Sequence, residues 1–239
     1  MKKLLFSILC LTLIACTQSK TQEQKKTSTP DNEPKTPLVM QDNDKNGTMK
    51  KIMIIDGGPR KKMNTAAVVQ AFVEGAREGG ADVKVVRLYD IDYKGCRSCM
   101  ACQLKDKRVP SCCFQDGLTD ILAECTEADG LVLASPIYYG EFTAQMRAFY
   151  ERLTFPWLSY KDFSVVAPKK MPVTMIYTMN ASPEQAPGTL QNMKGVETML
   201  GMSFGNTPEV IMANSTTQVN DYSHLQKAKE AGKRMAMHE

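Results

Sequence analysis

The sequence predicts an α/β fold in which a doubly wound, five-stranded parallel sheet forms the centre. Apolar runs alternate with segments of helical periodicity from residue 49 to the end of the chain, and strands that alternate with helices favour a parallel sheet. The first run, Ile-Met-Ile-Ile at 52–55, is continuously apolar, which is typical of a strand buried on both faces. With 43% hydrophobic residues, the chain can fill one core.

Each strand is expected where a short run of apolar, mostly β-branched residues is bounded by polar or turn residues. These runs lie at 52–55, 82–88, 131–134, 172–177 and 209–213. Helices are expected where apolar side chains recur three and four residues apart. These segments lie at 65–78, 116–128, 143–155, 189–200 and 220–237. Ligands bind beyond the carboxyl ends of the strands in such sheets, so 57–64, 136–142 and 178–187 are the expected binding loops.

Residues 1–15 have the form of a lipoprotein signal peptide. A basic Met-Lys-Lys start precedes an apolar run that is too short to span a bilayer comfortably. The run ends in Leu-Ile-Ala-Cys, which resembles the lipobox of bacterial lipoproteins. The resemblance implies cleavage before Cys16, acylation of Cys16 and a lipid anchor on the extracytoplasmic side of the bacterial cell envelope. A plain signal peptide or a single anchoring helix is the alternative.

Residues 16–48 are polar and rich in Thr, Gln, Lys, Asp and Pro, so we expect the lipidated Cys16 to be followed by a disordered tether. Residues 49–239 have the length of one ordinary domain. The net charge of +4 is slight for a chain of this length and does not indicate a nucleic-acid partner.

The stretch GGPRKKMNT at 57–65 has the features of a phosphate-binding turn. Asn64 is expected to cap the following helix, whose free N–H groups favour an anion. Gly58 allows a close backbone approach, Arg60 can form two hydrogen bonds to a phosphate, and Thr65 can add a hydroxyl. Neither a Walker A loop nor the dinucleotide-binding glycine motif is present. The alternative is a structural turn before a capped helix.

Three segments in this order resemble the NAD(P)H-dependent FMN reductases, including their iron-sulfur flavoprotein relatives. They are GGPRKKMNT, KGCRSCMAC with the following CCFQDGLTDIL, and ADGLVLASPIYYGEFTAQMRAFYERL. The resemblance implies a flavodoxin-like, FMN-binding domain over 49–239. It assigns the FMN phosphate to the backbone of Gly58 and to Arg60, Asn64 and Thr65, although the family usually has Ser at Gly58. It assigns the isoalloxazine ring to Pro136, Ile137, Tyr138, Tyr139 and Gly140.

The function implied is an FMN-dependent NAD(P)H oxidoreductase of the flavin or quinone reductase type, anchored to a membrane. NAD(P)H would reduce FMN, and FMN would reduce a quinone, a flavin or another small electrophile. The flavin carries the hydride chemistry, so no catalytic residue is assigned. The family also implies a possible homodimer. The alternatives are a flavodoxin-like electron carrier or redox-sensing lipoprotein without NAD(P)H turnover, and a binding lipoprotein that has lost FMN.

The cysteines allow three interpretations. Cys96, Cys99 and Cys102 are spaced by two residues and are followed by Cys112 and Cys113, a spacing that iron–sulfur clusters use. The intervening residues 103–111 are more than the iron-sulfur flavoproteins have, and a signal peptide without twin arginines disfavours export of an assembled cluster. We therefore prefer disulfides, which form outside the cytoplasm, although the pairing is not readable. The third interpretation is that the cysteines are inherited from the family and have no role in this protein. Cys125 is expected in the core.

Overall fold

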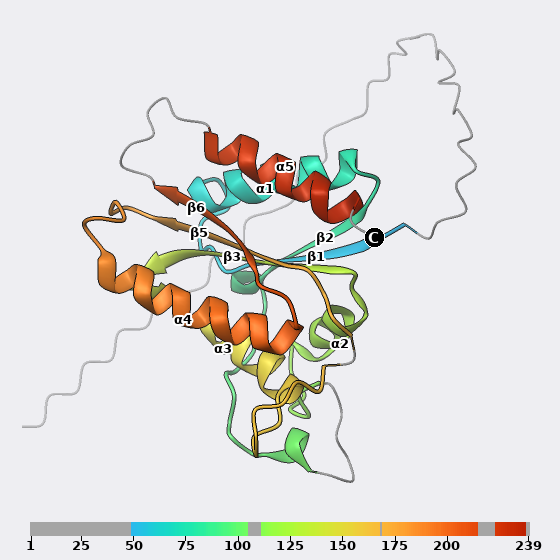
Figure 1. Ribbon diagram of the computed structural model, residues 1–239. Coiled ribbons are helices and arrows are strands. Elements are labelled where there is room, and N and C mark those ends of the chain that lie inside the picture. Colours follow the sequence, from blue (N-terminus) through green and yellow to red (C-terminus); the bar gives the residue numbers. More distant parts are fainter. Residues whose placement is uncertain (1–48, 105–110, 168, 215–222, 238–239) are drawn as a thin grey trace, which may run out of the picture. The chain divides into compact units, whose positions relative to one another are not determined.

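The computed structural model describes residues 49–104, 111–167, 169–214 and 223–237 (Figure 1). The predicted signal peptide, the lipidation of Cys16 and the tether therefore lie outside the described residues, as do residues 220–222 of the predicted last helix. In the described part of the chain, no helix combines the length and the hydropathy that a membrane span requires.

The sheet has the predicted parallel strands in the order β2-β1-β3-β5-β6. The strands are β1 (Lys51–Asp56), β2 (Asp82–Arg87), β3 (Gly130–Tyr138), β5 (Val173–Met179) and β6 (Glu209–Asn214), and a short β4 (Glu141–Phe142) pairs antiparallel with β3. All neighbours on the main path are parallel. The predicted doubly wound fold is confirmed. The strand order reverses between β1 and β3, where such sheets bind their ligands.

Helices cover both faces of this sheet (Figure 1). They are α1 (Asn64–Glu78), α2 (Thr119–Glu127), α3 (Ala144–Thr154), α4 (Pro187–Phe204) and α5 (Ser223–Met237). Helices α1 and α5 lie on one face, and α2, α3 and α4 lie on the other.

Strand β1 explains why the apolar run is continuous. Ile52 and Ile54 belong to the core cluster that packs under α1 and α5, whereas Met53 and Ile55 belong to the cluster under α2, α3 and α4. Side chains alternate between the two faces of a strand, so a strand covered on both faces needs an apolar residue at every position.

The starts of α1, α3 and α2 differ from the prediction. Met63 occupies the N-cap of α1 and Asn64 is the first helical residue, so the predicted Asn64 cap is wrong. Thr143 was expected inside the third helix but is the N-cap of α3, where its hydroxyl accepts the Met146 N–H at 3.3 Å. Helix α2 begins at Thr119 rather than at 116, because the Asp116 carboxylate accepts the Leu118 N–H at 3.0 Å before the helix starts.

Helices α1 and α5 approach each other through two glycines. A Cβ atom added at Gly75 would lie 1.8 Å from the Lys229 carbonyl oxygen, and one added at Gly232 would lie 2.2 Å from the Phe72 carbonyl oxygen. No side chain fits between the two backbones at these positions. The absence of a Cβ atom on each helix therefore sets their separation.

We expect Gly75→Ala to lower the free energy of unfolding by at least about 1 kcal/mol, since overpacking outweighs the gain in helix propensity. Urea unfolding followed by the fluorescence of the single tryptophan, the buried Trp157, measures this change. The matched control is Gly195→Ala in α4, where the added Cβ meets no atom within 4 Å. That change should stabilise the protein by about 0.5–1 kcal/mol. Equal effects of the two substitutions would contradict the close helix contact.

Candidate functional site

The turn after β1 and the hairpin after β3 meet at the carboxyl edge of the sheet. The Gly57 N–H donates to the Ala134 carbonyl oxygen at 2.7 Å, which continues the β1–β3 ladder by one residue. The Thr143 hydroxyl donates to the Gly57 carbonyl oxygen at 2.9 Å. The structure therefore brings together the two segments in which the sequence predicted a ligand site.

The start of α1 offers unused hydrogen-bond donors. Met63 provides no side-chain cap, and the first turn contains no acidic residue. The N–H groups of Asn64, Thr65 and Ala66 have no acceptor among the described residues, since the first helical bond runs from Ala67 to Met63. A helix start with free N–H groups and no acidic residue in its first turn attracts an anion.

Three side chains from the predicted set lie at or near these donors and differ in their burial and contacts. The Thr65 hydroxyl is buried and lies 2.7 Å from the Thr178 hydroxyl, which fixes its position. Arg60 is exposed and has no ion pair within the described ranges, so its guanidinium can turn toward an anion at the helix start. Asn64 is half-buried at the first helical position.

A partly buried ion pair that the sequence did not reveal stabilises the turn. Arg87, at the end of β2, lies with Nη1 2.7 Å from Asp56 Oδ2 and donates from Nη2 to the Gly58 carbonyl oxygen at 3.2 Å. The Gly58 N–H donates to Asp56 Oδ1 at 2.7 Å. Burial raises the pKa of Asp56 above its usual value, although the Gly58 N–H and Arg87 act in the opposite direction. Both backbone groups of Gly58 are therefore engaged within the protein.

The same contact explains why glycine stands at position 58. A Cβ atom there would lie 2.9 Å from Asp56 Oδ1, closer than side-chain atoms normally approach. The Asp56 carboxylate therefore occupies the space that a serine at this position would need. This turn therefore lacks the serine hydroxyl of the family, and the Asp56 carboxylate holds the turn instead.

The segment expected as a loop at 136–142 is a β-hairpin, so the loop prediction is wrong here. Strand β3 continues through Pro136 and Ile137 to Tyr138, which pairs with Glu141 of β4. The two linking residues, Tyr139 and Gly140, have φ values of +52° and +82°. Positive φ at both central residues is the signature of a type I′ turn, which matches the twist of a two-residue hairpin.

Tyr139 is held in an unusual conformation. A bulky residue with positive φ is strained, and such strain concentrates at functional positions. Its ring is fully exposed, while Tyr138 is partly exposed beside it. Both line an open cavity of about 510 Å³ together with Tyr89 and Arg147. The hairpin therefore presents two aromatic side chains next to the phosphate-binding turn.

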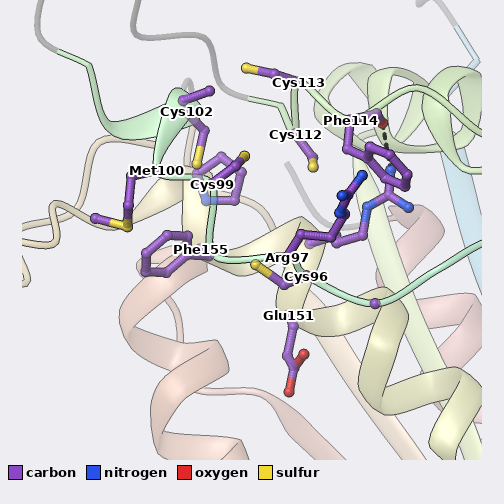
Figure 2. Close-up of a pocket in the computed structure, with 14 residues that line it drawn as sticks. Cys96, Arg97, Cys99, Met100, Cys102, Cys112, Cys113, Phe114, Glu151 and Phe155 are labelled. Atoms are coloured by element: carbon purple, nitrogen blue, oxygen red, sulfur yellow. Dashed lines mark hydrogen bonds between the residues drawn. The ribbon is translucent and has the colours of Figure 1, made fainter.

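Five cysteines line a separate cavity of about 310 Å³ (Figure 2). They are Cys96, Cys99, Cys102, Cys112 and Cys113. All are thiols, so the preferred disulfides are not present in the described residues. Cys125 is buried in the core, as predicted. Burial raises the pKa of Cys125 to about 12, which keeps this thiol protonated.

A buried arginine forms one wall of the cysteine cavity. Arg152 is 1% exposed, and its Nη1 lies 2.6 Å from Asp116 Oδ2. It also donates to the carbonyl oxygens of Lys94 at 2.9 Å and Phe114 at 2.7 Å. Burial acts to raise the pKa of Asp116, but the hydrogen bonds from Arg152, Leu118 and Lys94 prevail and hold this pKa below its usual value.

The model of the NADPH-dependent FMN reductase family matches residues 50–217. The chain belongs to this family. Among curated proteins, it is 32% identical over 115 residues to an iron-sulfur flavoprotein of Methanosarcina thermophila, covering 48% of this chain and 57% of the relative. It is 31% identical over 102 residues to an iron-sulfur flavoprotein of Methanocaldococcus jannaschii, covering 43% and 51%. The chain thus matches about half the length of these relatives.

Known structures support the fold. An NAD(P)H:quinone oxidoreductase from Methanothermobacter marburgensis superposes with a TM-score of 0.60 at 19% identity, covering 80% of this chain and 99% of that protein. An FMN-dependent NADH-azoreductase from Bacillus anthracis, in complex with FMN, gives 0.59 at 13% identity, covering 79% and 100%. At such identities the likeness concerns the fold alone.

The residues at the carboxyl edge fit the flavin mononucleotide that the FMN reductase family implies. The uncapped start of α1 offers N–H groups for a phosphate. The neighbouring hairpin offers exposed aromatic rings and backbone groups for a planar ring.

The cysteine cavity does not fit the iron–sulfur cluster that the relatives' names imply. A cluster needs several thiolates that converge on one point. Among the residues that the structure describes, no group of three or more Cys, His, Asp or Glu side chains is arranged to hold a metal ion. The cysteines come from two separate segments, with residues 103–111 between Cys102 and Cys112.

Replacing Gly58 by the serine that the family usually has should destabilise this protein. We expect Gly58→Ser to lower the free energy of unfolding by about 1–3 kcal/mol, because the new side chain meets Asp56 Oδ1. In an Asp56→Ala background the same change should cost at least about 1 kcal/mol less. Urea unfolding of the four proteins in this cycle measures the coupling, and equal costs in both backgrounds would refute it.

Proposed function

We propose that this chain is an FMN-dependent NAD(P)H oxidoreductase of the flavin or quinone reductase type, held at a bacterial membrane by a lipid on Cys16. The observation that carries the proposal is the uncapped start of α1 beside the β3–β4 hairpin, at the point where the strand order reverses. Membership of the FMN reductase family supports the cofactor and the donor.

The FMN phosphate binds at the start of α1. The N–H groups of Asn64 and Thr65 donate to it, and Arg60 supplies the positive charge. Gly58 shapes the turn rather than donating, since its N–H already donates to Asp56. The Thr65 hydroxyl, fixed by Thr178, can add a further contact to the phosphate.

The isoalloxazine ring lies against the hairpin. Tyr138 and Tyr139 provide flat apolar surfaces, while Pro136, Ile137 and Gly140 bring the backbone of β3 and its turn close to the ring. When bound, FMN supplies the hydride chemistry. The residues of the chain would bind and orient the cofactor, and none of them needs to act as an acid or a base.

NAD(P)H serves as donor and a quinone or a related small electrophile serves as acceptor. The two structural neighbours, an NAD(P)H:quinone oxidoreductase and an FMN-dependent azoreductase, share the fold and support this class of acceptor. Both substrates would use one open face of the flavin in turn, as the open cavity beside Tyr138 and Tyr139 allows. A homodimer is compatible with this scheme.

Arg60→Ala should weaken FMN binding by about 10- to 100-fold, the range for loss of a charge-assisted hydrogen bond of about 1.5–3 kcal/mol. Quenching of FMN fluorescence during titration of the full-length chain measures the affinity. Riboflavin, which lacks the phosphate, should bind the variant and the unaltered chain equally well. Arg77→Ala, at the opposite end of α1, is the matched control and should leave FMN affinity unchanged. If Arg60→Ala weakened riboflavin binding as much as FMN binding, Arg60 would not contact the phosphate.

Steady-state oxidation of NADPH by the FMN-loaded chain, with a soluble quinone as acceptor, tests the reaction itself. Turnover that depends on both FMN and the quinone is the expected result. Tight FMN binding without NADPH or NADH oxidation would overturn the reductase and favour the electron-carrier alternative. A chain that leaves FMN fluorescence unchanged would overturn the flavin site altogether.

Cys16→Ser should release the protein from the membrane fraction of a bacterial host, because the acyl chains hold it there. Cell fractionation followed by mass spectrometry of the amino-terminal peptide checks both the location and the acylation. Cys10→Ser is the matched control, since Cys10 follows Leu9 rather than a small residue, and it should remain acylated and membrane-bound. An amino-terminal peptide of the unaltered chain that carries no acyl group on Cys16 would exclude the lipid anchor.

A further inference from the structure

The cysteine cavity is built from two segments that the rest of the protein holds in place. Figure 2 shows the side chains of Cys99, Cys102 and Cys112 directed into the same space. Cys102 is buried and Cys112 is half-buried, whereas Cys99 and Cys113 are exposed. One segment supplies Cys96, Cys99 and Cys102, and the other supplies the adjacent Cys112 and Cys113.

Hydrogen bonds hold the first segment against the protein. The Gln103 side chain donates to the carbonyl oxygens of Phe155 at 2.7 Å and Leu158 at 3.0 Å. Ser98 and Met100, on either side of Cys99, have φ values of +51° and +59°. Non-glycine residues rarely adopt this left-handed conformation, and it persists where the surrounding structure fixes it.

The second segment is held by Arg152. The guanidinium donates to the Phe114 carbonyl oxygen at 2.7 Å, next to Cys113, and pairs with Asp116 at 2.6 Å. The Arg152 charge also lies over the Phe114 ring, 5.2 Å from its centre. The two cysteine-bearing segments thus face each other from separately fixed positions.

Figure 2 shows the thiols of Cys102 and Cys112 directed into the same space from the two segments, whereas Cys113 is not directed into it. The electrostatic neighbours agree, since burial raises the pKa of Cys102 to about 11 and Cys112 is the strongest charged neighbour of this thiol. Cys102 and Cys112 are therefore the pair that face each other across the cavity.

We propose that this cavity is a thiol–disulfide centre, in which Cys102 bridges to Cys112. Cys96 remains a thiol. It lies where the cysteine cavity adjoins a second cavity of about 390 Å³, lined by Tyr160 and Phe163 among others. The centre is independent of the flavin and acts on disulfides of small molecules or proteins.

Thiol–disulfide exchange at this centre needs neither a metal nor a flavin, because its atoms and electrons balance between the protein and the external disulfide. One thiolate of a pair attacks a sulfur of an external disulfide, which forms a mixed disulfide and releases one thiolate that takes up a proton. The second cysteine of the pair then loses its proton and attacks the mixed disulfide, which closes the protein bridge and releases the second external thiol. Two electrons and two protons pass from each cysteine pair to each external disulfide. The reverse sequence reduces the bridge.

The full-length chain, reduced with dithiothreitol and then treated with oxidised glutathione, tests the pairing directly. Free thiols are blocked with N-ethylmaleimide, and peptide mass spectrometry without reduction identifies the bridges. We expect the bridge Cys102–Cys112, with Cys96, Cys99 and Cys113 alkylated. This mapping uses the unaltered chain and does not depend on the folding of any variant. Bridges between other pairs, or five alkylated thiols in the cavity after oxidation, would overturn the proposal.

Cys102→Ala should abolish the bridge and leave Cys112 alkylated. Cys96→Ala is the matched control from the same cavity and should retain the bridge Cys102–Cys112. Iron and acid-labile sulfide are measured on the same anaerobic preparation, and both should be far below one per chain. Stoichiometric iron and sulfide, with visible absorption that dithionite bleaches, would instead assign the cavity to a cluster.

Discussion

The position of β1 between β2 and β3 is the constraint on which the rest of the structure depends. Ile54 and Ile55 are completely buried on opposite faces, and a slip of β1 by one residue would move the charged Lys51 or Asp56 into a position that an isoleucine fills. The ladder to β3 then carries the chain to Gly57, where the Ala134 carbonyl oxygen accepts its N–H. The turn at which we propose that the phosphate binds begins where the register of the central strand ends, and this is why it lies beside the hairpin of β3.

The regular parts of this fold could be predicted from the sequence because burial on two faces leaves a local pattern. Each parallel strand was predicted from its apolar run. The ends of the helices and strands could not be predicted from the sequence, because they depend on contacts with residues far away in the chain. Strand β3 continues past Pro136, where a stop was expected, because β5 and then β4 pair with it. The cap of α3 is Thr143 because its hydroxyl also reaches Gly57, 86 residues earlier.

The residues of the candidate site also divide into those that the sequence could predict and those that it could not. Residues that act through their own chemistry, such as Arg60 and the paired tyrosines, could be named from the sequence. Asp56 and Arg87 could not, because their contact joins residues 31 apart that meet only when β1 and β2 are parallel neighbours. The pair also changes the interpretation of Gly58. From the sequence it is a missing serine hydroxyl, whereas in the structure it is the space that the Asp56 carboxylate occupies.

Helix α3 separates the flavin site and the thiol centre that we propose. Its N-cap Thr143 lies beside the β3–β4 hairpin, and Arg152 near its end forms a wall of the cysteine cavity. Nine residues of helix correspond to about 13.5 Å, so the hairpin and the cysteine cavity lie toward opposite ends of α3. Thiol exchange needs direct attack of one sulfur on another, and hydride transfer needs contact with the flavin ring. The two proposed chemistries therefore use separate residues of this chain.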